Sequence, residues 1–146
     1  GILFGALSQA RPLFRPTTEL AALDWLNNNV PAESVILTAF DTSKLEPKTD
    51  IDTGNLIPAY TNLRPYVGHG PETAHATEKD ALTRRFFADQ LTADERRDLY
   101  ESVNIDYIFY GPQEQTLAVD VPVPLAWQAD ADKLYDVDGY QIWQVK

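Results

Sequence analysis

The sequence contains no cysteine and no methionine, and it contains only two histidines. Without cysteine the chain has no disulfide, no thiolate nucleophile and no Cys-ligated zinc or iron–sulfur site. The missing methionine predicts that Gly1 is not a natural start and that the chain is a piece of a longer protein. Apolar runs are short, well under the roughly 18 residues of a membrane-spanning helix, so we expect no span inside the chain.

Basic residues are few: Lys and Arg total 12 against 22 Asp and Glu, giving a formal net charge of −10. An acidic surface repels phosphate backbones, so nucleic acid is not an expected partner. Hydrophobic residues make up 44% of the 146 residues, which is enough to bury a core. We expect a single domain over residues 16–146, preceded by residues 1–15 as a membrane-exit or linker segment. The apolar opening equally fits a first strand or a cloning remnant.

Hydrophobic periodicity predicts a helix that begins at Thr17 or Thr18 and ends at the asparagines 27–29. Buried strands are predicted at 34–40 and 105–110, with a shorter strand at 63–67 that Pro65 places near an edge or bulge. Residues 53–55 form a turn signal. Two helices begin near Thr77 and Thr92, the second with a capping box that Glu95 completes.

The C-terminal part of the chain shows the clearest local signal. The prolines of residues 119–124 predict an extended segment. The dipeptide Asp138-Gly139 separates two strand-like runs, 134–137 and 140–145, and predicts a β-hairpin. The whole order of elements predicts an α/β protein, a Rossmann-like layered fold with a mainly parallel sheet and a C-terminal antiparallel hairpin.

Two carboxylates follow the predicted buried strands. Asp41 comes directly after residues 34–40, and Glu114 follows residues 105–110 in the run Gly111-Pro112-Gln113-Glu114. Parallel strands deliver their carboxyl ends to one edge of a sheet, where ligands bind in open α/β folds. Asp41, Gly111 and Glu114 are therefore candidates for a binding crevice, and the alternative is that both acids are ordinary loop carboxylates.

The segment 64–73 contains the densest set of special residues. Arg64 can bind a phosphate or carboxylate, and His69 can donate, accept or ligate. We expect this loop, with Glu72, to pack against the same sheet edge, so that Arg64 or His69 meets Asp41 or Glu114. The alternative is a structural turn in which Arg64 pairs with a carboxylate and His69 caps the end of a strand.

The sequence contains only weak signals for metal binding or nucleophilic catalysis. His69, Glu72 and His75 have no recognised metal-ligand spacing, and no serine lies in a nucleophile elbow, so we expect no metal, no cofactor and no catalytic residue. The arginine pairs 84–85 and 96–97 fit solvated helix faces with local acidic partners. Phe86 and Phe87 fit the core.

Three blocks of sequence, taken in order, carry a family resemblance. They comprise residues 13–16, 19–26 and 35–37; then 54–60 and 64–73; then 86–87 and 106–114. In this order they resemble the soluble C-terminal domain of bacterial integral-membrane glycosyltransferases of the GT-C type, which are similar to polyprenyl-phosphate-sugar mannosyltransferases. The resemblance covers roughly residues 12 to 146.

This resemblance implies a parent with many membrane helices and places the domain on the extracytoplasmic face. In such enzymes the catalytic carboxylate lies in a loop between the first membrane helices, a segment that is absent here, so no catalytic residue is carried over. The expected function is that of a non-catalytic accessory domain, with the transmembrane part of the same polypeptide as partner and a lipid-linked sugar or glycan acceptor as ligand. Two rivals remain: a stand-alone small-molecule binding module with an α/β crevice, and a hydrolase using Asp41 and His69.

Overall fold

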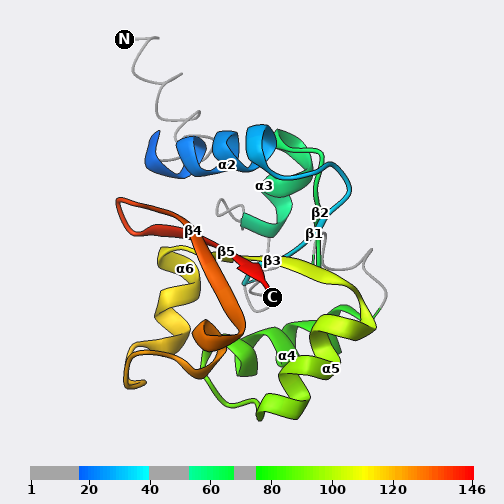
Figure 1. The fold of residues 1–146 in the computed structure, drawn as a ribbon, viewed down its shortest axis with the longest axis vertical. Helices are drawn as coiled ribbons and strands as arrows, with labels where there is room; N and C mark the ends of the chain where they lie inside the picture. The colour runs from blue at the N-terminus through cyan, green and yellow to red at the C-terminus, as the bar shows by residue number, and fades with distance from the viewer. Residues whose placement is uncertain (1–16, 40–52, 68–74) are drawn as a thin grey trace, which may run out of the picture.

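The computed structural model describes residues 17–39, 53–67 and 75–146 (Figure 1). Residues 1–16, which include the expected linker segment, lie outside the described residues. The described elements are α2 (Thr17–Asn29), β1 (Val35–Leu37), α3 (Thr53–Tyr60), β2 (Arg64–Pro65), α4 (Ala76–Phe87), α5 (Ala93–Ser102), β3 (Ile105–Tyr110), α6 (Pro112–Gln115), the 3₁₀ helices η4 (Thr116–Ala118) and η5 (Ala126–Asp130), β4 (Ala131–Val137) and β5 (Tyr140–Val145).

The described strands form a mixed five-stranded sheet in the order β2-β1-β3-β5-β4. Strand β1 pairs in parallel with β2 and with β3, but β1 has three residues and β2 only two. The longer strands pair antiparallel, β3 with β5 and β5 with β4. The prediction of a mainly parallel, Rossmann-like sheet is therefore wrong, although the protein is α/β.

The C-terminal hairpin is the physical reason for this difference. Asp138 and Gly139 both have positive φ, 50° and 84°, the pair of angles that a type I′ turn needs to join two twisted antiparallel strands. The turn confirms the predicted hairpin. Its second strand then pairs beside β3 from Tyr107–Gln144 to Tyr110–Gln141, so the hairpin supplies two of the five described strands.

The sheet separates two hydrophobic cores, and alternate residues of a strand enter different cores. Ile36 packs on the side of α2 and α3, whereas its neighbour Leu37 packs on the side of α4 and α5. Figure 1 shows the same arrangement, with α2 and α3 on one side of the sheet and α4 and α5 on the other. The α4 side holds an aromatic cluster centred on the fully buried Trp127, whose ring contacts Phe86 and Phe87. Both phenylalanines are thus core residues, as predicted.

The helix termini follow local rules in most places. Helix α2 spans the predicted range and buries Ala22, Leu23 and Leu26 on one face. Helix α5 begins with the predicted capping box, because the Thr92 hydroxyl accepts the N–H of Glu95 while the Glu95 carboxylate accepts the N–H of Thr92. These contacts satisfy amides that have no partner inside the helix.

Two local predictions are wrong. The turn expected at 53–55 is the first part of α3, because Leu56 and Ile57 are buried in the α2-side core and hold the helix despite Pro58. The segment 119–124, expected to be extended, instead turns after η4 and contains a cis peptide bond before Pro124. Over residues 17–39, 53–67 and 75–146, no helix has the length and apolar character needed to cross a membrane.

Candidate functional site

Glu114 lies where β1 and β3 end, and it is completely buried. Its Oε1 accepts the backbone N–H of Ala39 at 2.8 Å, and its Oε2 accepts the backbone N–H of Gly111 at 2.9 Å. Gly111-Pro112 ends β3 and opens α6, which directs the Glu114 side chain back across the sheet edge. One carboxylate therefore joins the carboxyl ends of two neighbouring parallel strands.

Burial dominates the electrostatics of this carboxylate. It raises the pKa of Glu114 from 4.5 to about 7, although the backbone N–H groups favour the ionised form. The charge of Glu19, a buried residue in the first turn of α2, raises the pKa further. A carboxyl group with this pKa can exchange a proton near neutral pH. Since both of its oxygens accept backbone N–H groups, its observed role is to clamp two strand ends.

The surroundings of the clamp are closely packed. A Cβ added to Gly111 would lie 3.0 Å from Cε1 of Phe109 and 3.1 Å from Cδ1 of Tyr140, so this position has no room for a side chain. Within the described residues, the Thr38 hydroxyl is buried without a hydrogen-bond partner. Burying such a group costs free energy, so this edge combines tight packing with unfavourable polar burial.

Arg64 lies away from Glu114. It pairs in the sheet with Val35 at the amino end of β1, and its Nε lies 2.6 Å from Oε2 of Glu33, with both side chains exposed. Glu114 instead contacts Ala39, which lies four residues after Val35. At the strand rise of about 3.3 Å per residue, the backbone at Ala39 is about 13 Å from the backbone at Val35. The expectation that Arg64 meets Glu114 is therefore not met.

The remaining predicted site residues, Asp41, His69 and Glu72, lie outside the described residues. His75, the third member of the weak metal cluster, is exposed and its Nδ1 lies 3.4 Å from Oε2 of Glu78. In the part of the chain that the structure describes, no group of three His, Cys, Asp or Glu residues could hold a metal ion.

A second polar site was missed by the sequence analysis. Arg96 was expected on a solvated face, but it is buried and binds Asp130, whose Oδ2 lies 2.5 Å from the Arg96 Nε. The hydroxyl of Tyr100 also donates to Asp130 Oδ2 at 3.0 Å. The partners are 34 and 30 residues apart, so no local spacing could reveal them. The prediction is confirmed for Arg97, which is exposed and pairs with Asp94.

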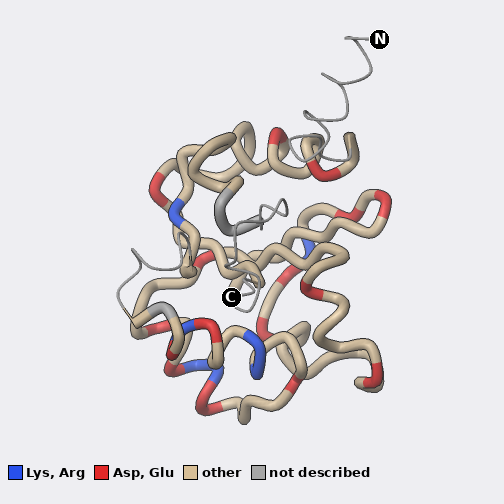
Figure 2. The backbone as a smooth tube through the Cα atoms, turned by 180° about the vertical axis from the view of Figure 1, so that it is seen from behind, with Lys and Arg blue, Asp and Glu red and all other residues tan. Residues whose placement is uncertain are grey.

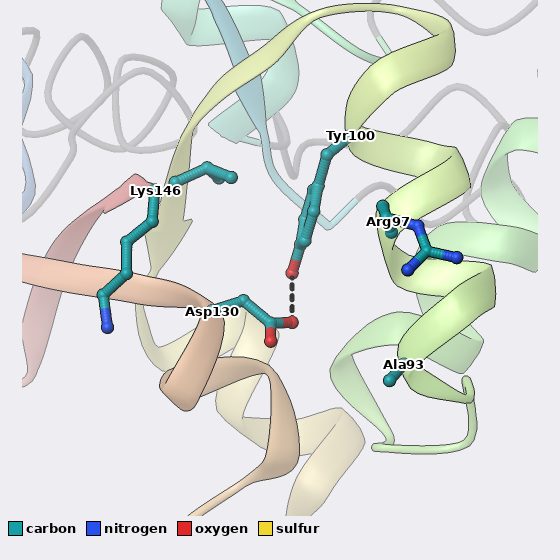
Figure 3. A pocket seen from close by; sticks show the side chains of 6 residues that line it. Ala93, Arg97, Tyr100, Asp130 and Lys146 are labelled. Carbon is teal, nitrogen blue, oxygen red and sulfur yellow. Dashed lines mark hydrogen bonds between the residues drawn. The ribbon is translucent and has the colours of Figure 1, made fainter.

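A cavity of about 330 Å³ opens beside this network, between α5 and the carboxyl end of β5. Figure 3 shows Tyr100 and Asp130 meeting at its centre, with Arg97 on the α5 side and Lys146 on the β5 side. The cavity is lined by Ala93, Arg97, Tyr100, Asp130, Val145 and Lys146. Val145 ends β5, and β5 runs antiparallel to β3, so the cavity lies at the end of the sheet where β3 begins. The Glu114 clamp lies at the opposite end, where β3 ends.

The charges of the described chain are unevenly placed. Figure 2 shows Asp and Glu along most of the trace, whereas Lys and Arg gather on α4 and α5. Most of these cations have an acid beside them: Arg84 pairs with Asp80 and Arg85 with Glu95. Helices α4 and α5 therefore present mixed charge rather than a basic patch.

Comparison of the chain with protein-family models, with curated protein sequences and with solved structures finds no match in any of the three.

Proposed function

We propose that the chain is a non-catalytic accessory domain of a membrane glycosyltransferase, on the extracytoplasmic face of the membrane. In this role it contributes to recognition of the glycan acceptor or the lipid-linked sugar, with the transmembrane part of the same polypeptide as its partner. The order of the three sequence blocks that resemble GT-C enzymes supports the assignment to this class.

The observation that carries the non-catalytic part of the proposal is the Glu114 clamp. A general acid or base must reach a proton on the substrate, within about 2.6–3.2 Å or through one water. Glu114 is fully buried, and its two oxygens accept the N–H groups of Ala39 and Gly111. The acid with a pKa near neutrality is thus occupied in holding the fold.

The proposal is tested by two activity measurements. The 146-residue chain, incubated with a short-chain polyprenyl-phosphate mannose and a mannoside acceptor, is expected to give neither transfer nor hydrolysis. In the parent polypeptide, deletion of residues 16–146 is expected to raise the KM for the acceptor or to lower kcat. Turnover by the chain alone that Glu114→Gln abolishes, or a deletion without effect on transfer, would contradict the proposal.

One observation favours a second candidate function, a stand-alone small-molecule binding module. The cavity beside Tyr100 has the size of a small ligand site, although it lies at the opposite end of the parallel strands from the crevice that the sequence predicts. If this candidate holds, the chain binds its ligand without a membrane partner. Deleting residues 16–146 would then leave KM and kcat for glycosyl transfer unchanged.

A further inference from the structure

The polar wall of the cavity beside α5 is fixed by buried contacts. Arg96, which is buried, reaches Asp130 through both Nε and Nη2 and donates its Nη1 to the carbonyl oxygen of Leu91. The backbone N–H of Lys146 donates to the carbonyl oxygen of Asp130 at 3.0 Å. A site whose groups are already held in place loses little conformational freedom when a ligand binds.

The cavity offers both hydrogen-bond donors and acceptors. A carboxylate has about four acceptor sites, and the Oδ1 of Asp130 has one long contact, 3.4 Å from Nη2 of Arg96. The Tyr100 oxygen donates its proton to Asp130 and can still accept. Arg97 and Lys146 supply donors from the two sides (Figure 3). Hydroxyl groups, which both donate and accept, match this mixture better than groups that only accept or only donate.

The charges around the cavity cancel. Asp130 is neutralised by Arg96, Arg97 has Asp94 at 2.8 Å, and the Lys146 ammonium lies 3.9 Å from Asp132. The formal net charge of the chain is −10, so an anionic ligand gains no long-range attraction. A cationic ligand would meet the positive side chains of Arg97 and Lys146 inside the cavity. A neutral ligand is therefore favoured on electrostatic grounds.

Apolar surface completes the site. Tyr100, Val145 and Ala93 line the same space. A tyrosine ring presents an apolar face beside a polar tip, which suits a ligand with apolar carbon faces and hydroxyl edges. We propose that this cavity binds a neutral sugar ring, with its hydroxyl groups toward Asp130, Arg97 and Lys146 and a carbon face against Tyr100.

This inference rests on the cavity alone and holds whether or not the chain belongs to a glycosyltransferase. It is tested by titrating the ¹⁵N-labelled 146-residue chain with neutral methyl hexosides, namely the mannoside, glucoside and galactoside, and separately with inorganic phosphate. We expect at least one hexoside to give saturable shifts at the amides of Arg97, Tyr100 and Lys146. Phosphate is expected to give none at these amides.

A blocking variant and a matched control locate the binding. Ala93 is exposed in the first turn of α5, so Ala93→Phe places a ring in the cavity mouth without disturbing the core. Ala21 is an exposed alanine of α2, on the other face of the sheet, and Ala21→Phe is the control. Ala93→Phe is expected to weaken hexoside binding by about tenfold or more, and Ala21→Phe by less than about twofold.

Three results would overturn the inference. The first is the absence of saturable shifts at the cavity amides with every hexoside. The second is saturation of those amides by inorganic phosphate, which would make the cavity an anion site. The third is hexoside binding that Ala93→Phe leaves unchanged, since the sugar would then lie elsewhere on the chain.

Discussion

Replacing Glu114 by glutamine is expected to remove a pH dependence from the stability of the chain. Burial raises the pKa of Glu114 from 4.5 to about 7, so the folded chain keeps this proton over a pH range in which the unfolded chain has lost it. Its contribution to stability is therefore fully present below pH 4.5 and is lost as the pH rises through about 7. At about 1.4 kcal/mol per pH unit, the loss is about 3 kcal/mol.

Glutamine keeps the shape of the side chain but cannot ionise. Its amide oxygen can accept one of the two N–H groups of the clamp, while its NH₂ group faces the other N–H. The opposed donors are expected to cost about 1–3 kcal/mol at every pH. Glu114→Gln is thus expected to be less stable than the wild type near pH 5, and as stable as the wild type or more stable near pH 8.

The assay is urea unfolding near pH 5 and near pH 8, followed by tryptophan fluorescence, for which the buried Trp127 is a reporter. Glu101→Gln, at an exposed position of α5, is the control and should follow the wild type at both pH values. Comparing variant and wild type at the two pH values cancels the titration of all other groups. If Glu114→Gln keeps the full pH dependence of the wild type, the clamp does not titrate as described and the reasoning fails.

Three further substitutions probe the fold by the same unfolding assay. Gly111→Ala places a Cβ 3.1 Å from a ring carbon of Tyr140 and should cost about 1–3 kcal/mol; an unchanged unfolding midpoint would show that the ring moves aside freely. Arg96→Ala removes the charged partner of Asp130, a partly buried acid, and should cost about 2 kcal/mol or more, whereas Arg97→Ala at an exposed pair should cost less than about 0.5; equal effects would contradict the burial of Arg96. Gly139→Ala, at φ 84°, should cost about 1 kcal/mol, and a stabilised variant would refute the I′ turn.

Local signals in the sequence predict the elements that local physics controls. The Thr92–Glu95 capping box and the Asp138-Gly139 turn each involve residues within a few positions of one another, and both are confirmed. The turn predicted at 53–55 is wrong because a distant core buries Ile57 and outweighs the local preference of glycine and asparagine. Tertiary packing of this kind leaves no trace in a short window of sequence.

Long-range pairing explains the remaining differences. The hairpin itself was predicted, but nothing within residues 134–145 specifies that β5 pairs with β3, and that pairing makes the sheet largely antiparallel. Glu114 is predicted from its position after a strand, yet the backbone N–H that its Oε1 accepts belongs to Ala39, 75 residues away. Arg96 looks like its exposed neighbour Arg97 in sequence, and only the folded chain separates them.

Fractionation of the source cells tests the central proposal most directly. An antibody raised against the 146-residue chain should detect a protein far larger than this chain, in the membrane fraction and resistant to alkaline carbonate extraction. Such a protein would carry several apolar segments of about 20 residues, as a parent with many membrane helices requires. A band near the size of the 146-residue chain that carbonate releases from the membranes, or that never enters the membrane fraction, would contradict the proposal.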